Sequence, residues 1–156
     1  KKFCEQQWKH NAARSLRIME SLTGMTFRRC FTVYLTYAGM SGGKYLGRVG
    51  PKSCPYAFLW GGREDFANYT TVYIWHELLH GYLPMNNLGH AVIQLLTDNE
   101  LRFRLNGKKH PYPPFLGHRY LAPLQQRLLP LWKRYLARKD KRHIRQFIYD
   151  AKQVPP

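Results

Sequence analysis

The stretch IWHELLHGYL, residues 74–83, carries two histidines four positions apart, with a glutamate directly after the first. Residues four apart lie on one face of an α-helix, so His76 and His80 come close enough to share a tetrahedral ion. The flanking apolar residues indicate a largely buried helix: Val72, Ile74, Trp75, Leu78, Leu79 and Leu83. Buried imidazoles and a buried carboxylate are unfavourable without a partner, and zinc is such a partner. A core helix whose histidines bond internally is the alternative.

The segments on either side predict a chain of the α+β class, because helical and strand patterns alternate without internal repeats. Pro84 is expected to end the helix that carries the two histidines. The expected elements, in chain order, are a helix over 3–22, strands over 29–37, 44–48 and 56–60, helices over 66–83 and 88–106, a proline-rich loop over 108–118, and one or two basic helices over 121–138 and 140–152, interrupted near Pro130 and Lys139.

A catalytic zinc site needs a third protein ligand, and the next helix offers His90, Asp98 and Glu100. At 100° per residue, Glu100 points out of a mostly apolar stripe, where an unpaired carboxylate is unfavourable. Asp98 lies about 160° away, four residues before Arg102, which is typical of an exposed ion pair. His90 is a candidate only if the turn at 84–89 folds back over the metal. Glu100 is the predicted third ligand, and a buried glutamate paired with an arginine is the alternative.

His76-Glu77-x-x-His80, followed by Asn99-Glu100 on a second helix, resembles the gluzincin branch of the zinc metallopeptidases, best known from the thermolysin-like enzymes. The resemblance covers about residues 54–106 and implies a minimal zincin-like domain. In such a domain a small mixed sheet packs on the HExxH helix and on a second ligand-bearing helix. The resemblance implies a metalloendopeptidase in which His76, His80 and Glu100 hold one zinc ion per chain and Glu77 is the general base.

The same resemblance places a strand before the motif helix, with its edge holding the substrate backbone, and residues 56–60 stand at that position. The sequence departs from the thermolysin-like pattern at Arg104, where the family has an aspartate that supports a zinc histidine. The metzincin pattern is absent too, because no glycine and histidine follow His80 at its spacing. The family membership is therefore clearer than the subfamily.

A further donor usually stabilises the oxyanion formed during peptide hydrolysis, and the loop HPYPPFLGHRY supplies candidates for it. His118 and Tyr120 are the predicted catalytic residues of this loop, with His110 and Tyr112 behind them. Each of these side chains is equally compatible with a packed or surface position in a loop.

The 156 residues are expected to form a single domain, 1–156, with a formal net charge of +16 from 25 Lys and Arg against 9 Asp and Glu. The segment WKRYLARKDKRHIRQF, residues 132–147, is the most basic part of a basic helical tail over about 121–152. Such a tail is expected to bind nucleic acid or another polyanion, or to select acidic peptides as substrates. A basic nucleic-acid-binding domain and a catalytically inactive zincin scaffold are therefore the alternative functions.

Three cysteines, Cys4, Cys30 and Cys54, allow at most one internal disulfide, so a secreted disulfide framework is not indicated. The apolar runs are too short to span a bilayer, so no transmembrane segment is expected. The start Lys1-Lys2 lacks a methionine and is compatible with a removed leader. The compartment stays open, with a lean toward the cytoplasm.

Overall fold

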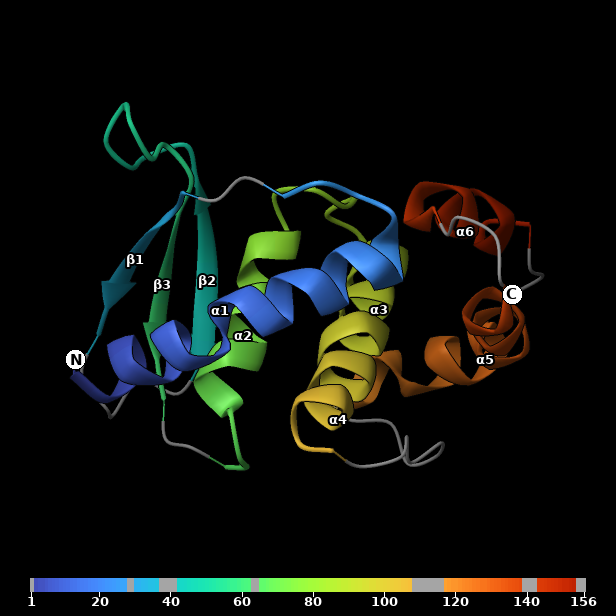
Figure 1. Ribbon diagram of the computed structural model, residues 1–156. Helices are drawn as coiled ribbons and strands as arrows, with labels where there is room; N and C mark the ends of the chain where they lie inside the picture. Colours follow the sequence, from blue (N-terminus) through green and yellow to red (C-terminus); the bar gives the residue numbers. More distant parts are fainter. Residues whose placement is uncertain are drawn as a thin grey trace.

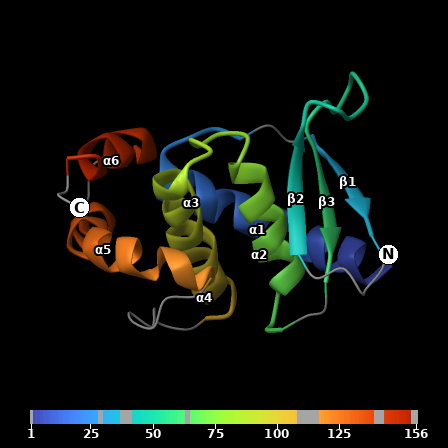
Figure 2. The ribbon, with the colours of Figure 1, turned by 180° about the vertical axis from the view of Figure 1, so that it is seen from behind.

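The computed structural model describes residues 2–27, 30–36, 42–62, 65–107, 117–138 and 143–153. The elements lie in a row, with the sheet at one end, α2 and α3 beside it, and α5 and α6 at the other end (Figures 1 and 2). In chain order they are α1 (Lys2–Thr23), β1 (Thr32–Leu35), β2 (Gly42–Gly47), β3 (Ala57–Gly61), α2 (Tyr69–Leu79), α3 (Asn87–Gln94), the π-helix η1 (Leu95–Leu101), α4 (Arg102–Leu105), the 3-10 helix η2 (Arg119–Leu121), α5 (Ala122–Ala137) and α6 (Ile144–Ala151). The α+β class is confirmed.

The sheet is mixed, with β3 in the centre, parallel to β1 and antiparallel to β2. Residues 56–60 were expected to form a strand whose free edge holds the substrate backbone, and this expectation is wrong. Strand β3 is paired on both sides, so β2 is the edge strand on the side of α2 (Figure 2). A bulge between Tyr45 and Gly47 shifts the register of β2 against β3, as is common at sheet edges.

The helix expected over residues 3–22 is present as α1, which lies across α2 (Figure 1). Three of its buried residues are polar: Asn11, Ser15 and Thr23. The Asn11 amide donates to the side chains of Asn68, at 2.8 Å, and Thr71, at 3.2 Å. Burial of Asn11 is thus compensated by hydrogen bonds to the first turn of α2, and this fixes how α1 lies on α2.

The segment that runs through α3, η1 and α4 is the centre of the core. All residues from 91 to 101 are buried, so this helix is enclosed on every side. Helix α2 ends at Leu79, before the expected stop at Pro84, and Pro130 lies inside α5 without interrupting it. Within the described ranges, no helix combines the length and the apolar character needed to cross a membrane.

A disulfide joins Cys30 and Cys54, whose Cα atoms are 5.2 Å apart. The two cysteines precede β1 and β3, so the bond ties together the starts of the parallel strand pair. Cys4 on α1 is the remaining, unpaired thiol. The expectation of at most one disulfide is confirmed.

Replacing both Cys30 and Cys54 by serine is expected to lower the free energy of unfolding by about 3 kcal/mol, because the bond closes a loop of 24 residues. Urea denaturation of the double variant against wild type measures the change. Cys4→Ser is the matched control and is expected to change stability little. Titration of three free thiols in the unreduced, denatured wild-type chain would contradict the assignment.

Candidate metal centre

Helix α2 presents His76 and His80 on one face, and its start is determined by residues from outside the helix. Asn68, with φ 65°, adopts the left-handed conformation that asparagine tolerates better than most residues, and its side chain makes no cap hydrogen bond. The Gln7 side chain of α1 instead accepts from the backbone N–H of Thr71 at 2.8 Å. The first turn of α2 is therefore anchored by α1, which fixes the direction in which the two histidines point.

A tight turn brings the following helix back toward α2. The Asn86 side chain accepts from the backbone N–H of Gly89 at 2.9 Å and caps the start of α3. A Cβ on Gly89 would lie 1.9 Å from the carbonyl oxygen of Pro84, so the turn requires glycine there. His90 follows directly, in the first turn of α3, and its ring is thereby placed over the face of α2 that carries His76.

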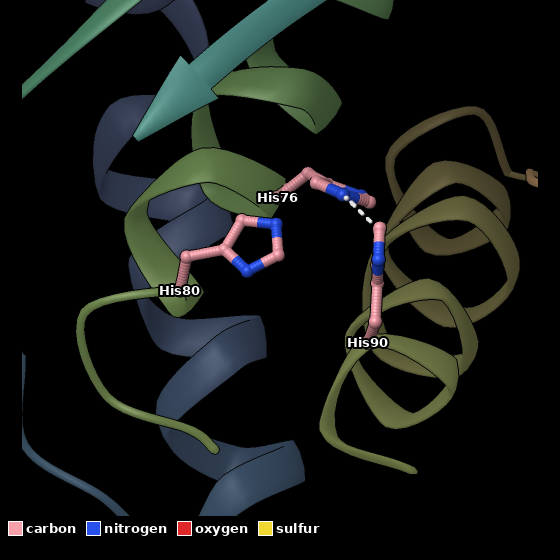
Figure 3. Close-up of side chains that lie close together, drawn as sticks. All are labelled: His76, His80 and His90. Carbon is pink, nitrogen blue, oxygen red and sulfur yellow. Dashed lines mark hydrogen bonds between the residues drawn. The ribbon is translucent and has the colours of Figure 1, made fainter. Parts of the chain in front are cut away.

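His76, His80 and His90 form a histidine cluster in which the three rings converge from α2 and α3 (Figure 3). One nitrogen of each ring lies within 4.8 Å of the others, and Nε2 of His76 is 3.1 Å from Nε2 of His90. Two ligands of a tetrahedral zinc ion lie roughly 3.3 Å from each other. The spacing of the cluster therefore matches three ligands of one metal ion.

The protonation and burial of the cluster suit a metal site as well. Burial first, and the neighbouring imidazoles second, lower the pKa of His80 and of His90 to about 4. Both rings are therefore neutral at neutral pH, the form in which histidine binds metals. His76 is buried, while His80 and His90 are half-buried, so one side of the cluster stays accessible. A catalytic zinc needs such an open side for its fourth position.

Asp98 completes the surroundings of His76. Its Oδ2 lies 3.7 Å from Nδ1 of His76, and both atoms are buried without a hydrogen-bond partner among the described residues. A metal held at Nε2 leaves the ring proton on Nδ1, where it faces this carboxylate, and metal-binding histidines commonly have such a partner. The exposed Asp98–Arg102 pair expected from the sequence is therefore wrong. Asp98 is 2% exposed, and the Arg102 guanidinium lies 3.6 Å above the Phe66 ring.

The π-helix explains why sequence reasoning placed Asp98 on the wrong side. A π-helix closes its hydrogen bonds over five residues instead of four, so each residue turns less about the axis than in an α-helix. Leu95–Leu101 adopts this form, and its seven side chains are all buried. Extrapolation at 100° per residue consequently fails within this segment. Short π-helical segments are frequent at functional sites.

The structure does not bring the predicted third ligand, Glu100, to the histidines. Its side chain is fully buried and its Oε2 accepts from Nε of Arg104 at 3.1 Å. This is the arginine that stands where the thermolysin-like pattern has an aspartate. The alternative of a buried glutamate paired with an arginine fits this geometry, and His90 takes the position that was expected for Glu100.

Glu77 lies beneath the edge strand β2. A Cβ on Gly43 would lie 2.6 Å from Cγ and 2.7 Å from Oε1 of Glu77, so only glycine leaves room for the carboxylate at this point of the strand. Burial raises the pKa of Glu77, while His76 and a backbone hydrogen bond from Tyr45 act in the opposite direction. The side chain is 6% exposed. The carboxylate is therefore held under the edge strand, within electrostatic reach of His76.

His118 stands at the rim of the cluster, with its ring centroid 4.8 Å from that of His90 and 6.5 Å from that of His76. The Tyr120 ring stacks on it at 5.5 Å and is 64% exposed. Gly117, with φ 99°, packs against the buried Gln94 side chain and so holds the chain close to α3. Both predicted loop residues thus lie beside the cluster. His110 and Tyr112, named with them, lie outside the described residues.

Comparison with family models, with curated proteins and with solved structures found no match for this chain. The site is therefore defined by its own geometry. The sequence analysis named His90 as a candidate metal ligand, on the condition that residues 84–89 fold back over the metal. The sequence did not indicate the π-helix, so Asp98 was assigned to an exposed ion pair with Arg102.

Removing His90 is expected to weaken zinc binding on the order of a hundredfold or more, because a direct ligand is lost and ligand supports alone contribute 10- to 100-fold. Glu100→Gln is expected to retain most of the affinity, since Glu100 is bonded to Arg104. Competition with a chromophoric chelator measures both dissociation constants, with the exposed His10→Ala as control. The opposite ranking, with Glu100→Gln abolishing binding and His90→Ala tolerated, would restore Glu100 as the ligand.

Asp98→Asn is expected to weaken zinc binding by about 10- to 100-fold, because the partner of the His76 Nδ1–H loses its charge. The same competition titration measures this loss, and Asp65→Asn, at an exposed position, is the matched control. Thermal melting of the metal-free variants separates a positioning role from a loss of fold. Unchanged zinc affinity in a folded Asp98→Asn variant would show that Asp98 does not position His76.

Proposed function

We propose that the chain is a zinc-dependent peptidase in which His76, His80 and His90 hold the metal and Glu77 is the general base. The observation that carries the proposal is the position of the Glu77 carboxylate, which is buried under the edge of the sheet and interacts electrostatically with His76 of the cluster. A purely structural zinc site usually has four protein ligands, most of them cysteines, and no open coordination position. Here the described ligands are three histidines, and the side beside His80 and His90 is accessible.

A zinc ion held by His76, His80 and His90 would supply Lewis-acid chemistry to the site. The residues of the chain supply the remaining functions. Glu77 accepts the proton of the attacking water and passes it to the leaving amine. Asp98 holds His76 in the tautomer that binds metal. His118, at the rim, donates to the developing oxyanion, and Tyr120 supports its ring by stacking.

Strand β2 is the surface suited to hold the substrate. It is the edge of the described sheet on the side of α2, and Gly43 and Tyr45 lie against Glu77. An extended peptide adds to such an edge through backbone hydrogen bonds, which align it independently of its sequence. A peptide paired with β2 would place a backbone carbonyl next to Glu77 and the histidine cluster. This geometry favours a polypeptide over a small-molecule substrate.

Glu77→Gln is expected to lower peptide hydrolysis by about 10²- to 10⁴-fold, because the general base is lost. Zinc affinity is expected to stay within about threefold of wild type, since Glu77 is not a ligand. The measurement is cleavage of a mixed peptide library by the zinc-loaded chain, followed by mass spectrometry, with a chelated sample as blank. Activity that survives verified removal of the metal would contradict the mechanism, and an inert zinc-loaded wild type would favour the inactive scaffold.

A second variant displaces the Glu77 carboxylate without replacing Glu77 itself. The Cβ added by Gly43→Ala would push on the Glu77 carboxylate, so turnover should fall while zinc stays bound. Gly62→Ala is the matched control, because its Cβ would meet the Trp60 ring at an ordinary 3.5 Å. Equal activities of the two glycine variants would show that catalysis does not depend on the approach of β2 to Glu77.

A further inference from the structure

The junction of α5 and α6 lies at the end of the molecule away from the sheet (Figures 1 and 2). A hollow of about 550 Å³ is found at this junction. Cationic and polar side chains line it together with one aromatic ring: Arg138, His143, Arg145, Gln146 and Tyr149. Both arginines are exposed, and the Tyr149 ring is 63% exposed. We call these five residues the junction hollow.

Charge is concentrated in this part of the chain. Residues 101–156 hold 14 of the 25 Lys and Arg but only two of the nine acids, Asp140 and Asp150. Asp150 accepts a hydrogen bond from the Gln146 amide at 2.8 Å. A second hollow, which shares Arg138 and adds Arg134, adjoins the first. The last third of the chain is therefore strongly basic, and the junction hollow lies within it.

Packing between the two helices fixes the shape of the hollow. The Phe147 ring of α6 lies 5.1 Å from that of Trp132 and 5.2 Å from that of Tyr135, both on α5. The Tyr135 hydroxyl in turn donates to the backbone carbonyl of Leu22 on α1. The apolar faces of α5 and α6 are thus anchored in the core, and their cationic faces are held toward solvent as a rigid surface.

We propose that the junction hollow binds single-stranded nucleic acid. The guanidinium groups of Arg138 and Arg145 contact backbone phosphates, for which their planar donor geometry is suited. The exposed ring of Tyr149 stacks on an unpaired base, as aromatic side chains do beside the charged grooves of single-strand binders. His143 and Gln146 add hydrogen-bond donors between these groups.

The composition of the surface favours nucleic acid over other anionic partners. A membrane-binding face would expose large apolar side chains for insertion, and within the described parts of α5 and α6 Tyr149 is the one large hydrophobic that is strongly exposed. An acidic protein would use the same charge and the same ring, and the competition by polyglutamate described below distinguishes it from nucleic acid. This binding does not depend on the metal centre or on the proposed peptidase activity.

The test is the affinity of the full chain for a fluorescent single-stranded oligonucleotide of about 20 nucleotides, measured by anisotropy between roughly 50 and 200 mM salt. The double variant Arg138→Gln/Arg145→Gln is expected to weaken binding about tenfold and to reduce the slope of log K against log salt by about 1.4, for two lost phosphate contacts. Tyr149→Ala is expected to weaken binding about fivefold or more, and Tyr149→Phe to retain it.

Lys9→Gln/Arg17→Gln on α1 is the matched control, because it removes the same charge from exposed positions elsewhere. Thermal melting verifies that every variant is folded. An equal loss in the control and in the junction variant would overturn the proposal, since binding would then follow total charge. Wild-type behaviour of Tyr149→Ala, or equal competition by polyglutamate, duplex or anionic vesicles, would overturn the assignment to single-stranded nucleic acid.

Discussion

The approach of α3 to α2 at the His76–His90 contact is the constraint around which the rest of the structure is arranged. It requires a chain reversal within a few residues, and Gly89 makes this possible because the Pro84 carbonyl occupies the space of a side chain. Once α3 lies there, the helix that continues from it must run through the core with every face covered. Helices α1, α2, α5 and α6 supply that cover.

Burial imposes a second condition, that polar groups inside this core find partners. Glu100 does so with Arg104, and Asn11 with the first turn of α2. Asp98 and His76 face each other at 3.7 Å without a hydrogen bond. A buried pair left in this state is unfavourable unless a ligand orders it. Among the described residues, six buried side-chain atoms have no hydrogen-bond partner, and three of them belong to His76, His80 and Asp98.

Local sequence patterns predicted the elements well, because apolar periodicity and capping residues act within a few positions. The helices over 3–22 and 66–83 and the strand over 56–60 are present with shifted ends. The errors involve long-range relations. Which strand forms the edge of the sheet depends on pairing between segments that are far apart in the sequence. The direction in which the Asp98 side chain points depends on the π-helix Leu95–Leu101. His76 and Glu77 were recognisable from spacing alone, whereas the choice between His90 and Glu100 needed the path of the turn.

The three histidines lie within the fifteen residues from 76 to 90, inside a single helical hairpin. Ordering them closes only a short loop, which carries a small entropy loss and is fast. Gly43, which packs on Glu77, lies 34 residues earlier and reaches it only after the sheet has docked. The three ligands thus come from one contiguous segment, which α1 orients, while the surroundings of the carboxylate require the packing of the sheet on α2.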